Sequence, residues 1–558
     1  MSRTLRWQVL LILCGMALAG ILLTYLALTY VVVQVPAVGG TYVEGVAGTP
    51  HYINPLLSAY NEADQDLCAL VFSGLTRFNS RGEVEPDLAR SWDVSIDGLI
   101  YVFHLRGNAR WHDGTPVTAD DVLFTVGLLQ DPDYPGPADV GAVWRALRAE
   151  KVDTYTVRFI LAEPYAPFLD FTTVGLLPSH LLTGTRAADL PELEFNLQPV
   201  GSGPFEVQEV DITDGEVSSV LLARNASYYG SPPLLDYLRF RFYSSSAAAF
   251  RAYEAGEVEG VSQITLESLP RARQAADLEL YSAQMAQTAV VFLNLGRPEE
   301  LPFFQQVEVR QALLYGLDRQ GLVERQLDGQ GVVAHSPIVA GTWAYDDQVP
   351  QYGYDPARAA ALLDGAGWPL LAGMSTRLQG TRTLSFTLLA SADALQTAVA
   401  QEVARQWGEL GVRATVVVTS PVALRQALEG RNYQALLITL ALPGDPDPYP
   451  FWHQTQIAAG QNYAGWDHRR ASEVLEAARV IVDPQRRRGL YQEFQTIFAQ
   501  EVPAILLYHP VYTYGVDRRV YGVQIGPLMR PADRLATVNR WHVAWRRTII
   551  SQSEAGTH

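Results

Sequence analysis

Lysine is almost absent from this chain of 558 residues: Lys151 is the only lysine among 42 lysine and arginine residues. A phosphate-binding P-loop needs a lysine followed by serine or threonine, whereas Val152 follows Lys151. The sequence therefore argues against a P-loop ATPase, and a partner would have to hydrolyse the nucleotide in any energy-driven process. The net charge of −17 argues against nucleic-acid binding, because a phosphate-binding surface needs clustered basic residues.

Cysteine is also scarce, with Cys14 and Cys68 as the two examples. Cys14 lies in an apolar run, so a disulfide with Cys68 is not expected, and Cys68 is predicted to be a small buried residue. Two thiols cannot build a zinc framework. The ten histidines are scattered and form no His-Glu-x-x-His pattern, so no protein-only metal site is predicted.

Charge is missing from one long stretch, since no Asp, Glu, Lys or Arg occurs between Trp7 and Val43. About 20 apolar residues span a bilayer, whereas a cleaved signal peptide has an apolar stretch of about 7–15 residues. Residues 1–38 are therefore predicted to be an uncleaved, single-pass membrane anchor and linker. Arg3 and Arg6 precede the run and place the N-terminus in the cytoplasm, so that the rest of the chain lies outside the membrane.

A histidine beside an aspartate, His112 and Asp113, raises the question of catalysis within FHLRGNARWHDGTPVTADDVLFTV (Phe103–Val126). The alternating apolar residues before them predict a half-buried strand, and the Asp-Gly pair predicts a turn. Thr118 and Asp121 resemble a capping box at the start of a helix. No serine or cysteine stands nearby for the histidine to activate. The stretch is therefore predicted to be structural.

Strands and helices alternate irregularly along the rest of the chain and predict an α/β fold with mixed sheets. Thr383–Ala390 predicts a strand, a helix follows, and Val412–Thr419 completes a strand–helix–strand unit. Near the C-terminus, a helix is expected around Arg486–Gln500, followed by a short buried strand within Val502–His509.

A series of short motifs resembles family 5 extracellular solute-binding proteins, the oligopeptide-, dipeptide- and nickel-binding components of ABC importers. Each motif is weakly specific alone, but all occur in the order of the family, and matches run from about Val43 to Tyr508. The motifs are PDLARSWDVSIDGLIYVFHLRGNARWHDGTPVTADDVLFTV (Pro86–Val126), PVGSGPFEV (Pro199–Val207), RNASYYGSPPLLD (Arg224–Asp236), AGEVE (Ala255–Glu259), VEVRQALLYGLDR (Val307–Arg319), YDPARAAALLDGAGW (Tyr354–Trp368), GDPDPYPFW (Gly444–Trp452) and QNYAGW (Gln461–Trp466).

The resemblance implies a fold of two lobes that close like a clamp, of the periplasmic-binding-protein type II class, with an extra inserted subdomain. The implied boundaries are 39–74, 197–286 and 507–548 for lobe I, 75–196 for the inserted subdomain, 287–506 for lobe II and 549–558 for a flexible tail.

The same resemblance implies a substrate-binding protein of an ABC importer, outside the cytoplasm and held at the cell membrane. It would capture a small solute, with a peptide as the first expectation, and deliver it to the permease and ATPase subunits. Two alternatives stay open: a protein of this fold specific for an oligosaccharide or metal chelate, or a ligand-sensing receptor for a membrane signalling partner. A hydrolase is disfavoured because Gly201–Gly203 forms no nucleophile elbow, and no catalytic residue, metal or cofactor is predicted.

The resemblance, together with the large contact area that aromatic side chains supply, predicts a set of ligand contacts. These are Ser58, Tyr60, Asn61, Trp144, Ser262, Gln263, Thr439, Leu442, Asp445, Trp452, Tyr463, Trp466 and Tyr508, with Trp343 as a further aromatic candidate.

Leu442 marks one departure from the family pattern. Peptide binders of the family often carry an aspartate three residues before the Asp-Pro pair, where it holds the terminal ammonium of the peptide. A buried ammonium needs a charged or strongly accepting partner, and Leu442 cannot be one. Asp445 or Asp447 would replace it only in a rearranged loop, and Asp, Gly and Pro in this pattern also favour a simple turn. Sugars, amino-terminally blocked peptides and metal chelates therefore remain open as ligands.

Overall fold

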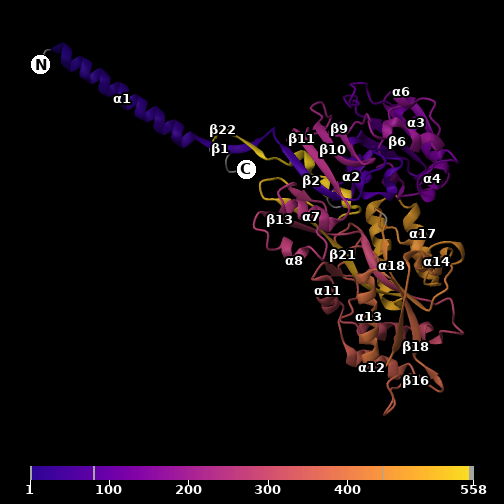
Figure 1. Ribbon diagram of the computed structural model, residues 1–558. Helices are drawn as coiled ribbons and strands as arrows, with labels where there is room; N and C mark the ends of the chain where they lie inside the picture. The colour runs from indigo at the N-terminus through magenta and orange to yellow at the C-terminus, as the bar shows by residue number, and fades with distance from the viewer. Residues whose placement is uncertain (1–2, 80–81, 443, 552–558) are drawn as a thin grey trace.

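The computed structural model describes residues 3–79, 82–442 and 444–551. Figure 1 shows a body of two lobes, one built from the indigo and magenta parts of the chain and the other mainly from the orange part. The last, yellow part of the chain contributes to both lobes. The predicted α/β class with mixed sheets is confirmed, because parallel and antiparallel strand pairs occur in one large sheet.

Helix α1 (Arg3–Thr29) stands away from the body, and strand β1 (Tyr30–Ala37) joins it to the upper lobe. Its apolar side chains, such as Leu11 and Ile21, are exposed. Within the described ranges, no helix has the length and hydropathy needed to cross a membrane. The predicted anchor is therefore not confirmed.

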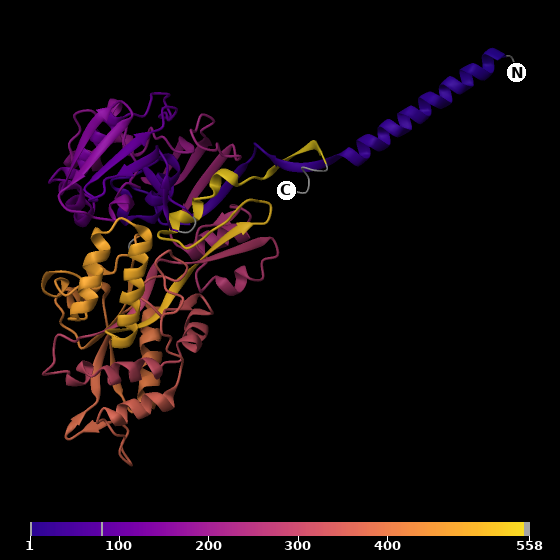
Figure 2. The same ribbon diagram turned by 180° about the vertical axis from the view of Figure 1, so that it is seen from behind.

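Strand β1 pairs antiparallel with β22 (Ala544–Ser551) over its whole length, from Tyr30 opposite Ser551 to Ala37 opposite Ala544. Figure 2 shows this two-stranded ribbon between α1 and the body. The flexible tail was predicted to begin at residue 549, but β22 continues to Ser551 because β1 supplies backbone partners there. Residues 552–558 of the predicted tail lie outside the described residues.

A twelve-stranded sheet runs through both lobes. In the upper lobe it contains β2 (Thr41–Ala47), β9 (Phe205–Thr213), β10 (Glu216–Arg224), β11 (Tyr237–Tyr243), β12 (Gly260–Val261) and β13 (Leu278–Gln284). In the lower lobe it contains β14 (Gln287–Leu293), β15 (Gly331–Val333), β18 (Ser385–Ser391), β19 (Arg413–Thr419) and β20 (Ala435–Ala441). Strand β21 (Ala504–Asp517) belongs to both parts.

Strand β21 is the longest link between the lobes. Its first part pairs with β14 and β15, with Pro510 opposite Gly331, and its second part pairs with β13 from Val511 onward. The sequence predicted a short strand here, which is wrong: the strand has 14 residues because partners from both lobes satisfy its backbone groups. Met285 and Ala286, which connect β13 to β14, form a second crossing beside it.

The inserted subdomain has an antiparallel sheet in the order β5 (Ala89–Val94), β6 (Ile100–Leu105), β8 (Thr156–Leu161), β7 (Leu147–Asp153). Its helices are α3 (Ala119–Gln130), α4 (Ala138–Arg145), α5 (Phe168–Phe171) and α6 (Ser179–Leu182), and a small hairpin joins β3 (Thr76–Phe78) to β4 (Val84–Pro86). Phe103, Phe159 and Phe168 pack edge to face in its core.

The structural interpretation of the His112 stretch is confirmed. Thr118 caps α3, and its backbone N–H donates to the carboxylate of Asp121 at 2.8 Å, which completes the predicted capping box. His112 lies 3.1 Å from the carbonyl oxygen of Gly203 and accepts from the N–H of Gly201 at 3.1 Å. Burial lowers the pKa of His112 to about 4. The neutral ring thus joins the inserted subdomain to the glycine-rich crossover.

The remaining α-helices are divided between the two lobes. They are α2 (Glu62–Val71), α7 (Ser246–Glu254) and α8 (Leu269–Ala272) in the upper lobe, and α9 (Pro302–Gln305), α10 (Val307–Tyr315), α11 (Arg319–Leu327), α12 (Pro356–Gly365), α13 (Ala394–Glu409), α14 (Pro421–Glu429), α15 (Tyr449–Trp452), α16 (Gln456–Ala459), α17 (Arg469–Val480) and α18 (Pro484–Glu501) in the lower lobe. The predicted strand–helix–strand unit is confirmed as β18–α13–β19, whose two strands pair in parallel.

A buried network of ion pairs joins residues near the beginning of the fold to Arg534 near its end, within the upper lobe. Arg534 is fully buried and donates to Glu44 of β2 at 2.5 Å and to Asp66 of α2 at 2.6 Å. Tyr514 of β21 donates to the same Glu44 at 2.5 Å. Burial raises the pKa of Asp66 to about 6 although Arg534 opposes that rise. The network therefore depends on the one guanidinium group that lies between both carboxylates.

We expect Arg534→Met to lower the free energy of unfolding by about 3–5 kcal/mol, because two carboxylates would be left buried without their partner. Urea unfolding measures the change. Arg518→Met is the control: its ion pair with Glu279 is exposed, so a change of less than about 1 kcal/mol is expected. Equal changes in the two variants would contradict the assigned role of Arg534.

Candidate ligand-binding site

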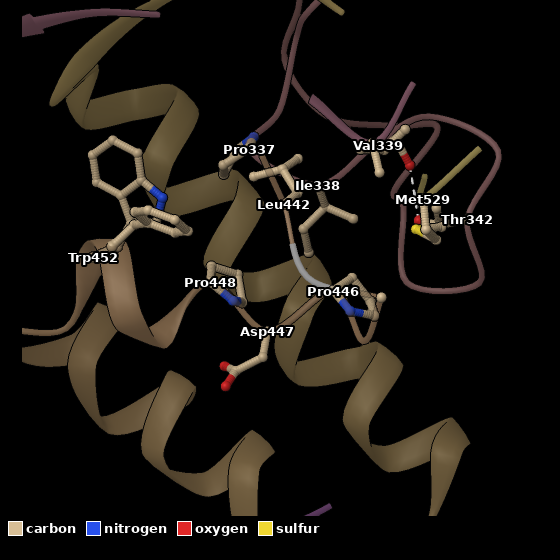
Figure 3. Close-up of a pocket in the computed structure, with 13 residues that line it drawn as sticks. Pro337, Ile338, Val339, Thr342, Leu442, Pro446, Asp447, Pro448, Trp452 and Met529 are labelled. Atoms are coloured by element: carbon tan, nitrogen blue, oxygen red, sulfur yellow. Dashed lines mark hydrogen bonds between the residues drawn. The ribbon is translucent and has the colours of Figure 1, made fainter. Parts of the chain in front are cut away.

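A small apolar cavity lies beside the crossing between the lobes. Figure 3 shows the side chains that surround it, which come from two segments of the lower lobe, from Ala286 between β13 and β14, and from Met529 of the upper lobe. The lining residues are Ala286, Pro337, Ile338, Val339, Thr342, Leu442, Gly444, Pro446, Asp447, Pro448, Phe451, Trp452 and Met529. The cavity has a volume of about 30 Å³, and one water needs about 10–15 Å³ by this measure. A peptide therefore fits only if the lobes or loops separate.

The loop Gly444–Pro448 forms one wall of this cavity and carries two buried carboxylates. Asp445 is held by Arg487 of α18 through two bonds of 2.8 and 2.6 Å. Asp447 accepts from Nε of Arg479 of α17 at 2.7 Å, and its carboxylate points away from the apolar side chains in Figure 3. Both carboxylates therefore already have guanidinium partners.

The pKa shifts around the loop follow from this pairing. The Asp445 carboxylate holds the pKa of Arg487 above its usual range although burial lowers it. Burial raises the pKa of Asp447, and the charge of Arg479 opposes that rise. The side chains of this loop thus form a neutralised structural unit in which neither carboxylate faces a ligand as a free anion.

The same loop contacts the inserted subdomain across the boundary between the lobes. The backbone N–H of Asp445 donates to the carboxylate of Asp170 in α5. The N–H of Ala166 donates to the carbonyl oxygen of Arg479 at 2.7 Å. The guanidinium carbon of Arg479 lies 4.0 Å from the ring centre of Tyr449 and 5.4 Å from that of Tyr165. The two halves of the body therefore meet closely at one edge of the cavity.

Gly444 allows this close approach. A Cβ atom at its position would lie 2.6 Å from Cζ of Phe78 and 2.7 Å from a carboxylate oxygen of Asp170, both on the inserted subdomain. Real Cβ atoms essentially never come within 3.0 Å of such atoms, so the ends of the Phe78 and Asp170 side chains would have to move. A larger residue at position 444 would therefore disturb the contact between the inserted subdomain and the lower lobe.

Several of the predicted ligand contacts cluster at the cavity. Leu442 and Trp452 line it, and Asp445 stands between two lining residues of the loop. Trp466 packs against Trp452 with ring centres 6.4 Å apart. Tyr463 and Trp452 both pack against Phe292, at 5.8 and 5.9 Å. These five predicted residues therefore belong to one aromatic and apolar region of the lower lobe.

Four further predicted residues lie in or after strands of the large sheet. Tyr508 is buried in β21. The hydroxyl of Thr439 in β20 accepts from Gln396 at 2.9 Å. The carbonyl oxygen of Ser262 accepts from the hydroxyl of Tyr512, and Gln263 is half-buried beside it. None of these four predicted residues lines the described cavity, and their ligand contacts stay predictions.

The predicted residues of the upper lobe have structural environments that need no ligand. Ser58 is buried and Tyr60 is 77% exposed. Asn61 caps α2, where its side-chain oxygen accepts from the N–H of Ala63 at 2.9 Å. Trp144 is buried in the core of the inserted subdomain, 5.8 Å from Phe159. Ligand contacts for these residues stay predictions too.

Trp343, the further aromatic candidate, is half-buried. The guanidinium carbon of Arg487 lies over the Trp343 ring, 5.2 Å from the ring centre. This places it behind the loop Gly444–Pro448, since Arg487 holds Asp445 of that loop.

Sequence reasoning missed the part of the cavity wall that lies outside Leu442 and the motif Gly444–Trp452. The segment Pro337–Thr342 and Met529 line the cavity, but they match no motif and have no periodic pattern. The sequence contained one indication of the partners Arg479 and Arg487, because two aspartates in a buried loop require positive charges nearby. Among the described residues, no cluster of three or more His, Cys, Asp or Glu side chains is arranged to hold a metal ion.

The comparisons with known proteins agree with this architecture. Residues 83–463 match the family described as bacterial extracellular solute-binding proteins, family 5 Middle. The chain is 28% identical to the oligopeptide-binding protein AppA of Bacillus subtilis over 518 residues, which are 91% of this chain and 92% of that protein. The structure of that protein in complex with a nonapeptide has a TM-score of 0.68 at 27% identity and covers 91% of this chain and 100% of that one.

Two further relatives have different ligands according to their names, a dipeptide and a nickel–histidine complex. The dipeptide-binding protein of Escherichia coli is 26% identical over 536 residues, which are 91% of this chain and 97% of that protein. NikZ of Campylobacter jejuni, solved in complex with Ni(L-His), has a TM-score of 0.70 at 26% identity and covers 90% of this chain and 99% of that one. With the two-lobed α/β fold and the family match in agreement, the chain belongs to family 5 of the bacterial extracellular solute-binding proteins.

Proposed function

We propose that this protein captures a peptide between its lobes and delivers it to the permease of an ABC importer. The observation that carries the proposal is the similarity to peptide-binding relatives along nearly the whole chain. The cavity at the crossing of the lobes supports it, because closure of two lobes about a hinge buries a ligand at such a place. We propose the boundaries predicted above for lobe I, the inserted subdomain and lobe II together with this function.

Among the described residues that line the cavity, none offers an unpaired carboxylate, which narrows the class of peptide that would fit. Leu442 is apolar and lines the cavity, while Asp445 and Asp447 are paired with Arg487 and Arg479. An ammonium group brought into this apolar cavity would lose its hydration without an anionic partner, which is costly. A peptide whose amino terminus is blocked, or lies outside the cavity, avoids that cost.

A metal chelate is the second candidate ligand. The solved relative NikZ holds Ni(L-His), and a chelate brings its own metal ligands, so that the protein needs no metal-binding cluster of its own. Trp452, Phe451 and Pro448 offer apolar surface for the organic part of such a ligand.

We also propose that helix α1 holds the protein at the membrane. The support is its 27 residues, its exposed apolar side chains and its position clear of the body. An isolated apolar helix in water would expose these side chains at a free-energy cost, and a lipid environment removes that cost. The body would then lie on the outer side of the membrane, as a substrate-binding protein requires.

Native mass spectrometry of the full chain in detergent tests the ligand class. The probes are a tripeptide pool, the same pool with acetylated amino termini, and Ni²⁺ with L-histidine. We expect the acetylated peptides to bind at least as well as the free ones and to stabilise the fold by about 2.7 kcal/mol at 100 times the dissociation constant. Binding of Ni(L-His) alone, with both peptide pools ignored, would overturn the peptide proposal.

Leu442→Asp provides the matched variant for the same experiment. The new carboxylate would face the cavity and supply the missing partner for an ammonium group, so we expect the variant to shift its preference toward free amino termini. An unchanged preference between the two peptide pools would show that position 442 does not meet the amino terminus of the ligand.

Gly444→Ala tests the closure of the lobes. Because its Cβ would collide with Phe78 and Asp170, we expect a larger radius of gyration in small-angle X-ray scattering and an unchanged thermal stability of each lobe. Gly107→Ala is the control, since a Cβ at that position meets nothing within 4 Å. A radius equal to that of the control would argue against closure at this contact.

Removal of residues 1–29 tests the anchor. We expect the full chain to sediment with membranes after a high-salt wash and the shortened chain to stay in the soluble fraction, because the apolar helix is lost. Release of the full chain by salt alone would contradict anchoring by α1 and would indicate an electrostatic attachment instead.

A further inference from the structure

The contact between Asp170 and the loop Gly444–Pro448 joins two parts that are far apart in the sequence. Asp170 lies in α5 of the inserted subdomain and accepts the backbone N–H of Asp445, which lies in the lower lobe. The only other bond described nearby across the same boundary, from Ala166 to Arg479, involves backbone groups alone. Asp170 is thus the side chain through which the inserted subdomain holds the loop.

The charges at this contact do not balance. The carboxylates are Asp170, Asp445 and Asp447, and the guanidinium groups are Arg479 and Arg487. The phenols that face them are Tyr101 of β6, Tyr165 before α5, Tyr449 of α15 and Tyr491 of α18. Burial raises the pKa of Tyr101 and Tyr165 to about 12 and that of Tyr491 well above its usual value, so these three stay neutral.

Within the part of the chain that the structure describes, Asp170 forms no ion pair of its own. Arg487 makes its two bonds with Asp445, and Arg479 bonds with Asp447. Burial, and then the neighbouring charge of Asp445, raise the pKa of Asp170 to about 8, although the N–H of Asp445 and the charge of Arg487 oppose the rise. A protonated carboxyl group still has an oxygen that accepts the N–H of Asp445, so protonation preserves the contact.

Separation of the lobes would expose Asp170 to water and return its pKa to an ordinary value of about 3.9. The closed arrangement therefore binds this proton more tightly than the open one. We propose that Asp170 is a positioning residue that latches the inserted subdomain to the loop Gly444–Pro448, and that each closing of the clamp takes up a proton at Asp170. This inference rests on the clamp motion of the proposed function.

The direction of the pH dependence follows from linkage. A group whose pKa is higher in the closed state favours closure most at pH values below its open-state pKa of about 3.9. That preference is lost progressively as the pH rises to about 8, the pKa of Asp170 in the closed state. Between these values, the closing constant falls by up to tenfold for each pH unit. Mildly acidic conditions thus favour the closed clamp.

The distance between two spin labels on the full chain in detergent measures closure. The labels replace the exposed residues Ile96 of the inserted subdomain and Val422 of the lower lobe, in a chain that carries Cys14→Ser. Pulsed electron spin resonance would record the distance at pH 5, 6, 7 and 8. We expect the population at short distance to fall several-fold between pH 5 and pH 8.

Two substitutions separate the latch from a general effect of pH. Asp170→Asn keeps an oxygen that accepts the N–H of Asp445 and removes the titrating group, so we expect the short distance at every pH. Asp170→Ala removes the acceptor, so we expect the long distance to dominate throughout. Asp133→Asn, an exposed carboxylate of the same subdomain, is the control and should respond to pH as the unsubstituted chain does. Circular dichroism confirms that each variant is folded.

Each contrary outcome has a distinct meaning. If Asp170→Asn keeps the pH response of the unsubstituted chain, the latch is overturned. If the tripeptide pool shortens the distance at constant pH but pH alone changes nothing, the latch is overturned while the clamp stands. If the distance is the same in every variant, at every pH and with each of the probes, the lobes do not move, and both the latch and the proposed clamp are overturned.

Discussion

The body is organised around one constraint, a strand that both lobes share. Strand β21 changes partners between Pro510 and Val511, from β15 of the lower lobe to β13 of the upper lobe. Proline has no N–H, so it leaves a gap in the ladder of hydrogen bonds at the point of this change. The second crossing, Met285–Ala286, lies beside it, and Ala286 is also a cavity-lining residue. The two backbone crossings and the candidate site therefore lie in the same region, so a ligand bound there, as proposed, would lie against the segments that connect the lobes.

Buried charged groups are paired differently around Arg534 and at the loop Gly444–Pro448. Around Arg534, one guanidinium group pairs with two carboxylates, and one of these, Glu44, also accepts from Tyr514; all four residues are buried in one lobe. This network holds a fixed structure. At the loop Gly444–Pro448, two complete ion pairs leave one carboxyl group unmatched across a boundary between lobes. Buried carboxylate and guanidinium groups thus give a rigid structure where all of them belong to one lobe. Where one carboxyl group belongs to the other side of the boundary, the same groups make the contact sensitive to pH.

The features that could be predicted from the sequence are those that depend on residues close together in the chain. The capping of α3 by Thr118, the β18–α13–β19 unit and the structural role of His112 follow from spacing and turn chemistry within a few residues. The motifs also identified the family, and they singled out Leu442 and Trp452, which line the cavity; their contacts with a ligand stay predictions. The length of β21 could not be predicted, because its second half is stabilised by β13, more than 200 residues away in the sequence. The partners of the aspartate loop and the segment Pro337–Thr342 were missed for the same reason, since tertiary packing alone brings them together.

The ribbon of β1 and β22 has a mechanical consequence. Eight residues of single chain would let the body tumble freely about the end of α1, because such a linker bends at every residue. Pairing over all eight positions joins the beginning and the end of the fold into a stiff lever of about 26 Å. The body then keeps a limited range of orientations relative to α1. Torque on the body is transmitted to the helix instead of being lost in the linker, so the fold limits not only how far the clamp stands from α1 but also which way it faces.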